Sequence, residues 1–226
     1  MVSSQYAYLL GNLLISLPIW LLFLVLRKDL RRKILVLGIL SAVYSPLAEI
    51  FCLRDYWIPQ FALGPFLPIE DFLFGLFSGG IGGVLYQVVY SKKLALRDIK
   101  SLWLKNLVIL TVITFILFII LNIFFKINSI YAMSLAFLII VLSIIYFRRD
   151  LWLPAIINGF LFAVLFCLGY QVLLIFIPNI FSQFWQLTNL SGIFILKIPL
   201  EEIIWAFSWG MIMGAVYEFS TDLKIL

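Results

Sequence analysis

Two short motifs of the same form place acidic residues where this chain could do chemistry. Residues 68–71 read PIED and residues 199–202 read PLEE, and a long apolar run follows each motif. Proline suits the first turn of a helix, and acids beside it interact favourably with the positive end of the helix dipole, so one interpretation is a helix start. Acids at membrane depth are costly and commonly functional, which is the other interpretation. The acidic residues concerned are Glu70, Asp71, Glu201 and Glu202.

An aromatic residue follows the first acid of each motif by four positions, Phe74 after Glu70 and Trp205 after Glu201. On a helix, this spacing puts the two side chains on one face. A carboxyl group beside an aromatic ring suits a reaction through a carbocation, because the acid moves a proton and the ring face stabilises positive charge. A carboxylic acid removed from water keeps its proton at neutral pH, and a second carboxyl group nearby separates an acid from a base. The motifs therefore favour proton-initiated chemistry on a hydrocarbon.

The composition decides where these motifs lie. The chain of 226 residues is 65% hydrophobic and only 12% charged, whereas soluble domains carry about 25% charged residues. The long apolar runs lack strict alternation, so the membrane-spanning segments are helices and not barrel strands. We predict an all-α polytopic membrane protein. About seven transmembrane helices are expected, at 6–26, 34–53, 68–90, 107–125, 130–147, 153–177 and 199–219.

Several kinds of site are excluded. The chain has no histidine, so imidazole ligation of haem or zinc and Ser-His-Asp catalysis are ruled out. Cys52 and Cys167 lie singly in apolar runs without metal-binding spacing. The glycine run at 78–84 lies inside a span, where small residues allow close helix packing, and lacks the preceding strand of a dinucleotide site. We expect no metal and no cofactor, and no sequence fingerprint supports a flavin.

Positive charge predicts the orientation. Of the 16 lysines and arginines, thirteen fall in loops or the tail on one side of the membrane if seven spans are drawn. The side rich in lysine and arginine is the cytoplasmic one, which places the N-terminus outside and the C-terminus in the cytoplasm. Basic loops beside anionic lipid account for the net charge of +5, so no nucleic-acid partner is needed.

The chain also repeats itself. A shift of 131 residues aligns the two acidic motifs and then two glycines and a tyrosine, and a shift of 121 aligns RKDL at 27–30 with RRDL at 148–151. We predict two parallel three-helix repeats, at 1–92 and 127–226, joined by an amphipathic cytoplasmic loop and a connector helix at 93–126. Parallel repeats place both motifs at one depth, on the outer side, where they can face one another.

Two further residues are candidates for binding a substrate. Glu49 lies near the outer end of the second span, at about the depth of the motifs, and is either a member of the site or an interfacial charge. Trp57 is one of several aromatic residues in the outer loops. These residues either anchor the protein at the interface or roof an entrance for a lipid-like substrate.

The duplicated motifs, together with DYWIP at 55–59, resemble the integral-membrane lycopene cyclase family, found as two small subunits in some actinobacteria and as a fused domain in fungi and archaea. The resemblance covers most of the chain apart from the connector. The family pattern is PxEE, and the first copy here departs from it by ending in Asp71. The resemblance implies cyclisation of the ψ ends of lycopene into ionone rings, an isomerisation without net redox.

On this resemblance, Glu70, Asp71, Glu201 and Glu202 would form the acid–base set of one site shared by the halves. Phe74 and Trp205 would stabilise the cation, and Glu49 and Trp57 would contact a lipid-soluble carotenoid. The alternatives are a carotenoid hydratase, in which water captures the cation, a proton-coupled transporter, and a structural membrane partner. The ring type, the number of ends cyclised, the donor carboxyl group and the oligomeric state stay open.

Overall fold

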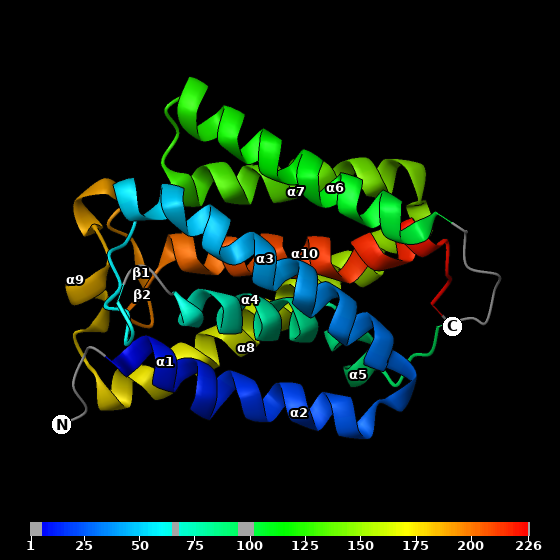
Figure 1. Cartoon of the computed structure of the whole chain (residues 1–226), viewed down its shortest axis with the longest axis horizontal. Helices are drawn as coiled ribbons and strands as arrows, with labels where there is room; N and C mark the ends of the chain where they lie inside the picture. The colour runs from blue at the N-terminus through cyan, green and yellow to red at the C-terminus, as the bar shows by residue number, and fades with distance from the viewer. Residues whose placement is uncertain (1–5, 65–67, 95–101, 226) are drawn as a thin grey trace.

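The structure is a computed structural model that describes residues 6–64, 68–94 and 102–225. It is a bundle of helices with a short β-hairpin at one end (Figure 1). The first helices are α1 (Ala7–Gly11), α2 (Leu17–Leu26), α3 (Arg31–Asp55), α4 (Ile69–Gly82) and α5 (Leu85–Val89). The others are α6 (Trp103–Ile119), α7 (Ser129–Phe147), α8 (Trp152–Phe176), α9 (Ile180–Phe184) and α10 (Leu200–Thr221). The hairpin consists of β1 (Phe194–Ile195) and β2 (Ile198–Pro199).

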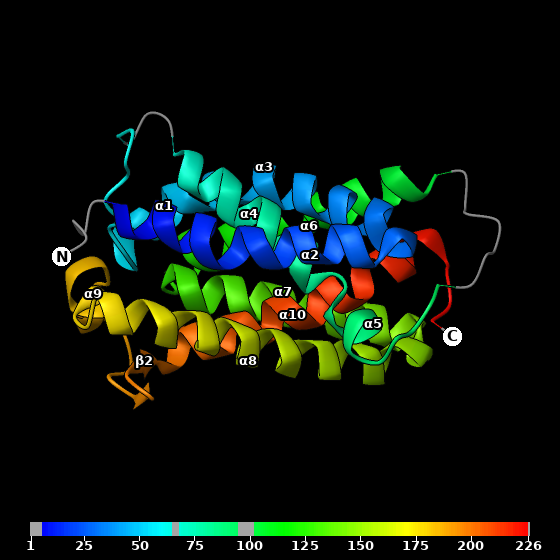
Figure 2. The ribbon, with the colours of Figure 1, turned by 90° about the horizontal axis from the view of Figure 1, so that it is seen from below.

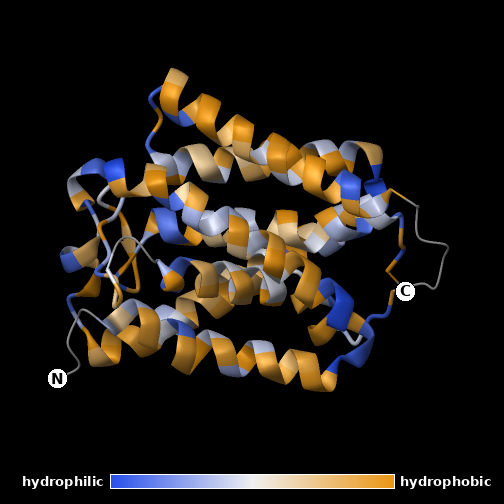
Figure 3. Ribbon diagram, in the orientation of Figure 1, coloured by the Kyte–Doolittle hydropathy of each residue, from blue (hydrophilic) through white to orange (hydrophobic). Residues whose placement is uncertain are grey.

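Six helical segments are long and apolar enough to cross a membrane, by length and composition, within the described residues. They are Ala7–Leu26, Lys28–Asp55, Trp103–Phe124, Ser129–Phe147, Arg149–Phe176 and Leu200–Thr221. Their middles are hydrophobic, and polar residues gather at the two ends of the bundle (Figure 3). The prediction of an all-α, multi-pass membrane protein is therefore confirmed.

The predicted third span, at 68–90, is the one that the structure does not show as a single helix. Residues 68–90 form two shorter helices, α4 and α5, separated by a turn at 83–84, so the count of seven spans stays a prediction. Asn158 of α8 satisfies the backbone at this break. Its Nδ2 donates to the carbonyl oxygens of Gly82 and Gly210, both at 2.6 Å, and its Oδ1 accepts from the Tyr86 N–H at 2.8 Å. Broken helices are tolerated in lipid when neighbouring groups satisfy the freed backbone in this way.

Glycines let α8 and α10 approach closely. A Cβ atom added to Gly210 would lie 2.7 Å from the Cβ of Phe162, and one added to Gly214 would lie 2.7 Å from the Cβ of Asn158. Gly79 of α4 faces Ser41 of α3 in the same manner. These contacts support the packing role predicted for the small residues.

The helices form two layers. One contains α1, α2, α3 and α4, and the other contains α7, α8 and α10 (Figure 2). Within the layers, α3 packs extensively on α4, and α8 packs extensively on α10. Along one side of the bundle α3 meets α7, and α6 packs against α3, α7 and α10 there. On the other side α1 meets α8. We call the boundary between helix Ala7–Leu26 and α8 the α1–α8 seam.

A compact cap closes the end of the bundle at which α1 begins. It contains α9, the hairpin and the segment after α3 (Figure 1), none of which the sequence predicted as regular structure. Asp55 at the end of α3 ties it together, since its backbone oxygen accepts from Asn128 at 2.7 Å and from Asn189 at 2.9 Å. Its carboxylate accepts from the Ser129 N–H at 3.1 Å.

The turns before α3 and α8, which contain the similar sequences RKDL and RRDL, each form the same kind of ion pair. Arg27 pairs with Asp29 at 2.8 Å, and Arg148 pairs with Asp150 at 2.7 Å. The repeats and their boundaries stay predictions. The amphipathic loop lies partly outside the described residues, because 95–101 belong to it.

Candidate active site

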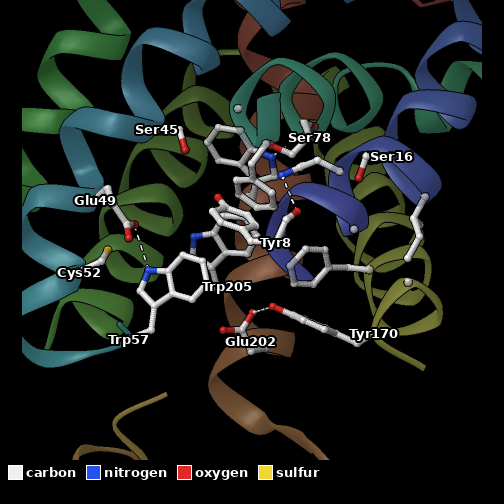
Figure 4. A pocket seen from close by; sticks show the side chains of 18 of the residues that line it. Tyr8, Ser16, Ser45, Glu49, Cys52, Trp57, Ser78, Tyr170, Glu202 and Trp205 are labelled. Atoms are coloured by element: carbon white, nitrogen blue, oxygen red, sulfur yellow. Dashed lines mark hydrogen bonds between the residues drawn. The ribbon is translucent and has the colours of Figure 1, made fainter. Parts of the chain in front are cut away.

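A cavity of approximately 210 Å³ lies beneath the cap, between the two layers (Figure 4). Side chains from helix Ala7–Leu26 and from α3, α4, α8 and α10 line it, together with residues of the cap. Its wall is mostly apolar and aromatic, with a few polar groups, which is the usual character of a site for a small hydrophobic ligand. Its polar and aromatic lining includes Tyr8, Tyr44, Glu49, Trp57, Phe74, Tyr170, Trp185, Glu202, Trp205 and Trp209.

Glu202 is the motif acid that faces this cavity (Figure 4). One carboxyl oxygen accepts from the Tyr170 hydroxyl at 2.8 Å, and the other accepts from the Trp185 indole N–H at 2.7 Å. The side chain is 4% exposed. Because each oxygen accepts from a donor, the carboxyl group is held in one orientation and at one position on the cavity wall.

Glu49 of α3 also lines the cavity (Figure 4). The Trp57 indole N–H donates to its Oε2 at 2.9 Å. Its Oε1 is buried and has no hydrogen-bond partner among the described residues. Buried polar atoms are nearly always paired, so an unpaired carboxyl oxygen on a cavity wall marks a group that can act on a bound molecule.

Asp71 reaches the cavity through a tyrosine. The Tyr8 hydroxyl donates to Asp71 Oδ1 at 2.9 Å, and Tyr8 lines the cavity whereas Asp71 lies behind it, fully buried. The structure thus supplies a hydrogen-bonded tyrosine to each second acid, Tyr8 to Asp71 and Tyr170 to Glu202.

The first acid of each motif faces elsewhere. Glu70 Oε1 accepts from the Ala62 N–H at 2.7 Å, and Glu201 Oε1 accepts from the Ser191 N–H at 2.7 Å and from the Tyr131 hydroxyl at 2.5 Å. Neither side chain is part of the cavity lining. Successive residues of a helix point about 100° apart, so neighbouring acids serve two places. Each first acid holds the loop that precedes its helix.

The aromatic residues predicted from the spacing come together from α4 and α10. The rings of Phe74 and Trp205 stack with centroids 5.7 Å apart, and Trp205 stacks on Trp209 at 5.8 Å with an interplanar angle of 9°. All three line the cavity. Electron-rich ring faces of this kind can stabilise a cation in a site that excludes water.

Trp57 belongs to a group of aromatic side chains of the cap that covers the cavity, which we call the roof. Its ring lies 5.2 Å from that of Trp185 and 5.1 Å from that of Tyr8, and the backbones of the two tryptophans form an isolated β-bridge. The contact between Trp57 and Trp185 therefore joins two segments that are far apart in the chain, and it covers the acidic residues of the cavity.

The structure thus brings together at one cavity Glu49, Trp57, Phe74, Glu202 and Trp205, with Asp71 one hydrogen bond away. It does not bring Glu70 or Glu201 there. The sequence did not single out Tyr8, Tyr170 or Trp209 for the site, whereas Trp185, like Trp57, is one of the outer-loop aromatic residues that could roof an entrance. A hydroxyl inside an apolar run was the available signal for the two tyrosines. No cluster of three or more potential metal ligands occurs among the described residues.

The comparisons with known proteins bear on the second half of the chain. Residues 128–220 match the family model described as lycopene cyclase, a stretch that includes α7, α8, the cap segment between α8 and α10, and the acids of the second motif. A search of the curated proteins and a search of the solved structures found no match to the chain. The match over residues 128–220 supports membership of this chain in the lycopene cyclase family.

Proposed function

We propose that this chain cyclises the ψ end groups of lycopene into ionone rings by protonation, without net redox. The observation that carries the proposal is the cavity, in which carboxyl groups face a wall of stacked aromatic rings. The family match supports a carotenoid as the substrate. A lipophilic substrate also suits a cavity that lies between membrane-spanning helices and is lined mainly by apolar side chains.

The reaction assigns a task to each part of the wall. A carboxylic acid gives its proton to the terminal double bond of the end group, and the cation formed is attacked by the internal double bond, which closes a six-membered ring. A carboxylate then takes a proton from the ring carbon next to the cation, which leaves a double bond and restores neutrality. Proton transfers of this kind require groups within hydrogen-bond reach of the substrate. Glu202 and Glu49 line the cavity and form the acid–base set of the proposal.

The remaining motif acids support this pair. Asp71 acts through Tyr8, whose hydroxyl faces the cavity. Glu70 and Glu201 hold the roof by accepting backbone N–H groups of the loops before α4 and α10. Phe74, Trp205 and Trp209 stabilise the cation and exclude water, which would otherwise capture it and give a hydrated product.

The orientation in the membrane belongs to the same proposal. The basic loops lie in the cytoplasm, the N-terminus lies outside, and the cavity with its cap lies toward the outer surface. The substrate is dissolved in the lipid.

We expect a lycopene-accumulating bacterium that expresses this chain to form an isomer of lycopene with the absorption of a ring-bearing carotenoid. Cyclisation leaves the mass unchanged, whereas a hydratase adds water, so chromatography with mass detection separates the two. A host with the same membrane level of a Glu202→Gln/Glu49→Gln variant serves as the control. Unchanged lycopene, with the wild-type protein folded in the membrane, would contradict the proposal and leave the transporter or the structural partner.

A further inference from the structure

The cavity comes nearest to the outer surface of the bundle at the α1–α8 seam. Gly11 and Ile15 of the first helix and Phe166 and Gly169 of α8 line the cavity, yet all four are only half-buried. The lining residues on the opposite wall, such as Tyr44 of α3 and Trp209 of α10, are buried. The wall of the cavity is therefore thinnest between the first helix and α8.

The opposite seam is closed. There α6 packs over the boundary between the two layers, against α3, α7 and α10. The rings of Phe51 and Tyr44 on α3 contact that of Phe115 on α6, with centroids 6.1 Å and 5.4 Å apart. A long hydrophobic molecule would have to displace this helix to reach the cavity from that side.

At the α1–α8 seam, a glycine of each helix faces a side chain of the other helix. A Cβ atom added to Gly11 would lie 3.5 Å from the Leu173 methyl groups, and one added to Gly169 would lie 3.6 Å from the Ile15 Cγ2 atom. The two glycines thus leave only the thickness of one side chain between the helices. The first helix is also the least buried of the six candidate spans, and it contains a π-helical turn at Asn12–Ser16, a feature often found at functional sites.

We propose that the α1–α8 seam is the passage for the substrate, and that Gly11 and Gly169 set its width. This inference rests on the proposed cyclisation and deepens it. A rigid polyene lies through the seam, with one end group in the cavity and the rest of the chain in the lipid. A cavity of approximately 210 Å³ holds one end group only. Each ring is therefore formed in a separate binding event, and the product of the first event carries one ring.

The activity test uses a pair of substitutions on one helix. Gly169→Phe places a ring in the seam, whereas Val164→Phe places one on a lipid-facing position of α8 that is 58% exposed and outside the cavity lining. We expect the initial rate of lycopene conversion to fall by about tenfold or more in Gly169→Phe and to change by less than about twofold in Val164→Phe. Gly169→Ala is expected to be tolerated, because its methyl group meets only an ordinary contact. Equal rates in Gly169→Phe and wild type would overturn the passage.

A second measurement needs no carotenoid. Cys52 lines the cavity and is a buried free thiol, so in a Cys167→Ala background it reports access from the membrane. An N-alkyl maleimide with a long chain is added to membranes, and labelling of Cys52 is followed by peptide mass. Gly169→Phe is expected to slow the labelling severalfold relative to Val164→Phe. Equal labelling rates contradict the passage even if lycopene is not the substrate. Slower labelling combined with no cyclisation by wild type upholds the passage and overturns the proposed function.

Discussion

Glu202→Gln is expected to lower the rate of ring formation by about 10²–10⁴-fold, the range typical for losing general acid–base catalysis. Glutamine has nearly the shape of glutamate, and its carbonyl oxygen can still accept from the Trp185 indole N–H while its amide NH2 donates to the Tyr170 hydroxyl oxygen, the two groups that hold the native carboxyl group at 2.7 Å and 2.8 Å. It cannot give or take the proton that starts or ends the reaction. The loss should therefore appear in turnover at unchanged membrane level, measured by pigment analysis against wild type.

Glu201→Gln is the matched control, since it makes the same chemical change one residue earlier on the same helix. The native Glu201 oxygen accepts from the Ser191 N–H and the Tyr131 hydroxyl, and a glutamine oxygen can accept from both. We expect this variant to keep most of its activity. A severe loss in Glu201→Gln with normal activity in Glu202→Gln would mean that the wrong acid of the motif has been assigned to the cavity.

The second large effect concerns stability at the other end of the bundle. The Lys33 ammonium group of α3 pairs with the Glu218 carboxylate of α10 at 2.5 Å, and the Gln87 amide donates to the same oxygen at 2.7 Å. Lys33 is 1% exposed and Glu218 is fully buried. Lys33→Met should destabilise the protein by about 3–5 kcal/mol, because it leaves the partner charge buried without compensation. Thermal unfolding of the detergent-solubilised protein measures the loss.

The double variant Lys33→Met/Glu218→Gln separates a lost charge pair from damaged packing. It removes both charges, and a glutamine at 218 can still accept from Gln87. We expect it to be more stable than Lys33→Met alone, since two neutral groups carry no unpaired charge. If the double variant loses as much stability as the two single variants together, the two residues act independently and the pair does not join α3 to α10.

The helical architecture could be predicted because the lipid leaves few choices. Apolar runs near the length of the hydrocarbon region predicted the helices of all six observed segments, and the observed bounds differ from the predicted ones by a few residues. The run at 68–90 could not be divided in the same way. The turn after Gly82 depends on Asn158, whose amide reaches it from another helix, and sequence periodicity does not report such contacts.

The chemistry of the site could be predicted further than its geometry. The motif acids and the aromatic residues four positions later pointed to α4 and α10, and Phe74 does stack on Trp205. We did not predict that the two neighbouring acids of each motif face different places, although a step of about 100° per residue already separates adjacent side chains on a helix. A roof of outer-loop aromatic residues was one of two interpretations, but the contact between Trp57 and Trp185 could not be predicted, because they come from segments far apart in the chain and meet only through the tertiary fold.

The most direct test of the central claim is isotopic. Membranes that contain the wild-type chain or Glu202→Gln are supplied with lycopene in D₂O, and the deuterium content of the product is measured by mass spectrometry. If a carboxylic acid protonates the end group, its proton exchanges with the solvent, and each ring formed should carry one deuterium. A wild-type ring product without deuterium would contradict cyclisation by a solvent-exchangeable acid.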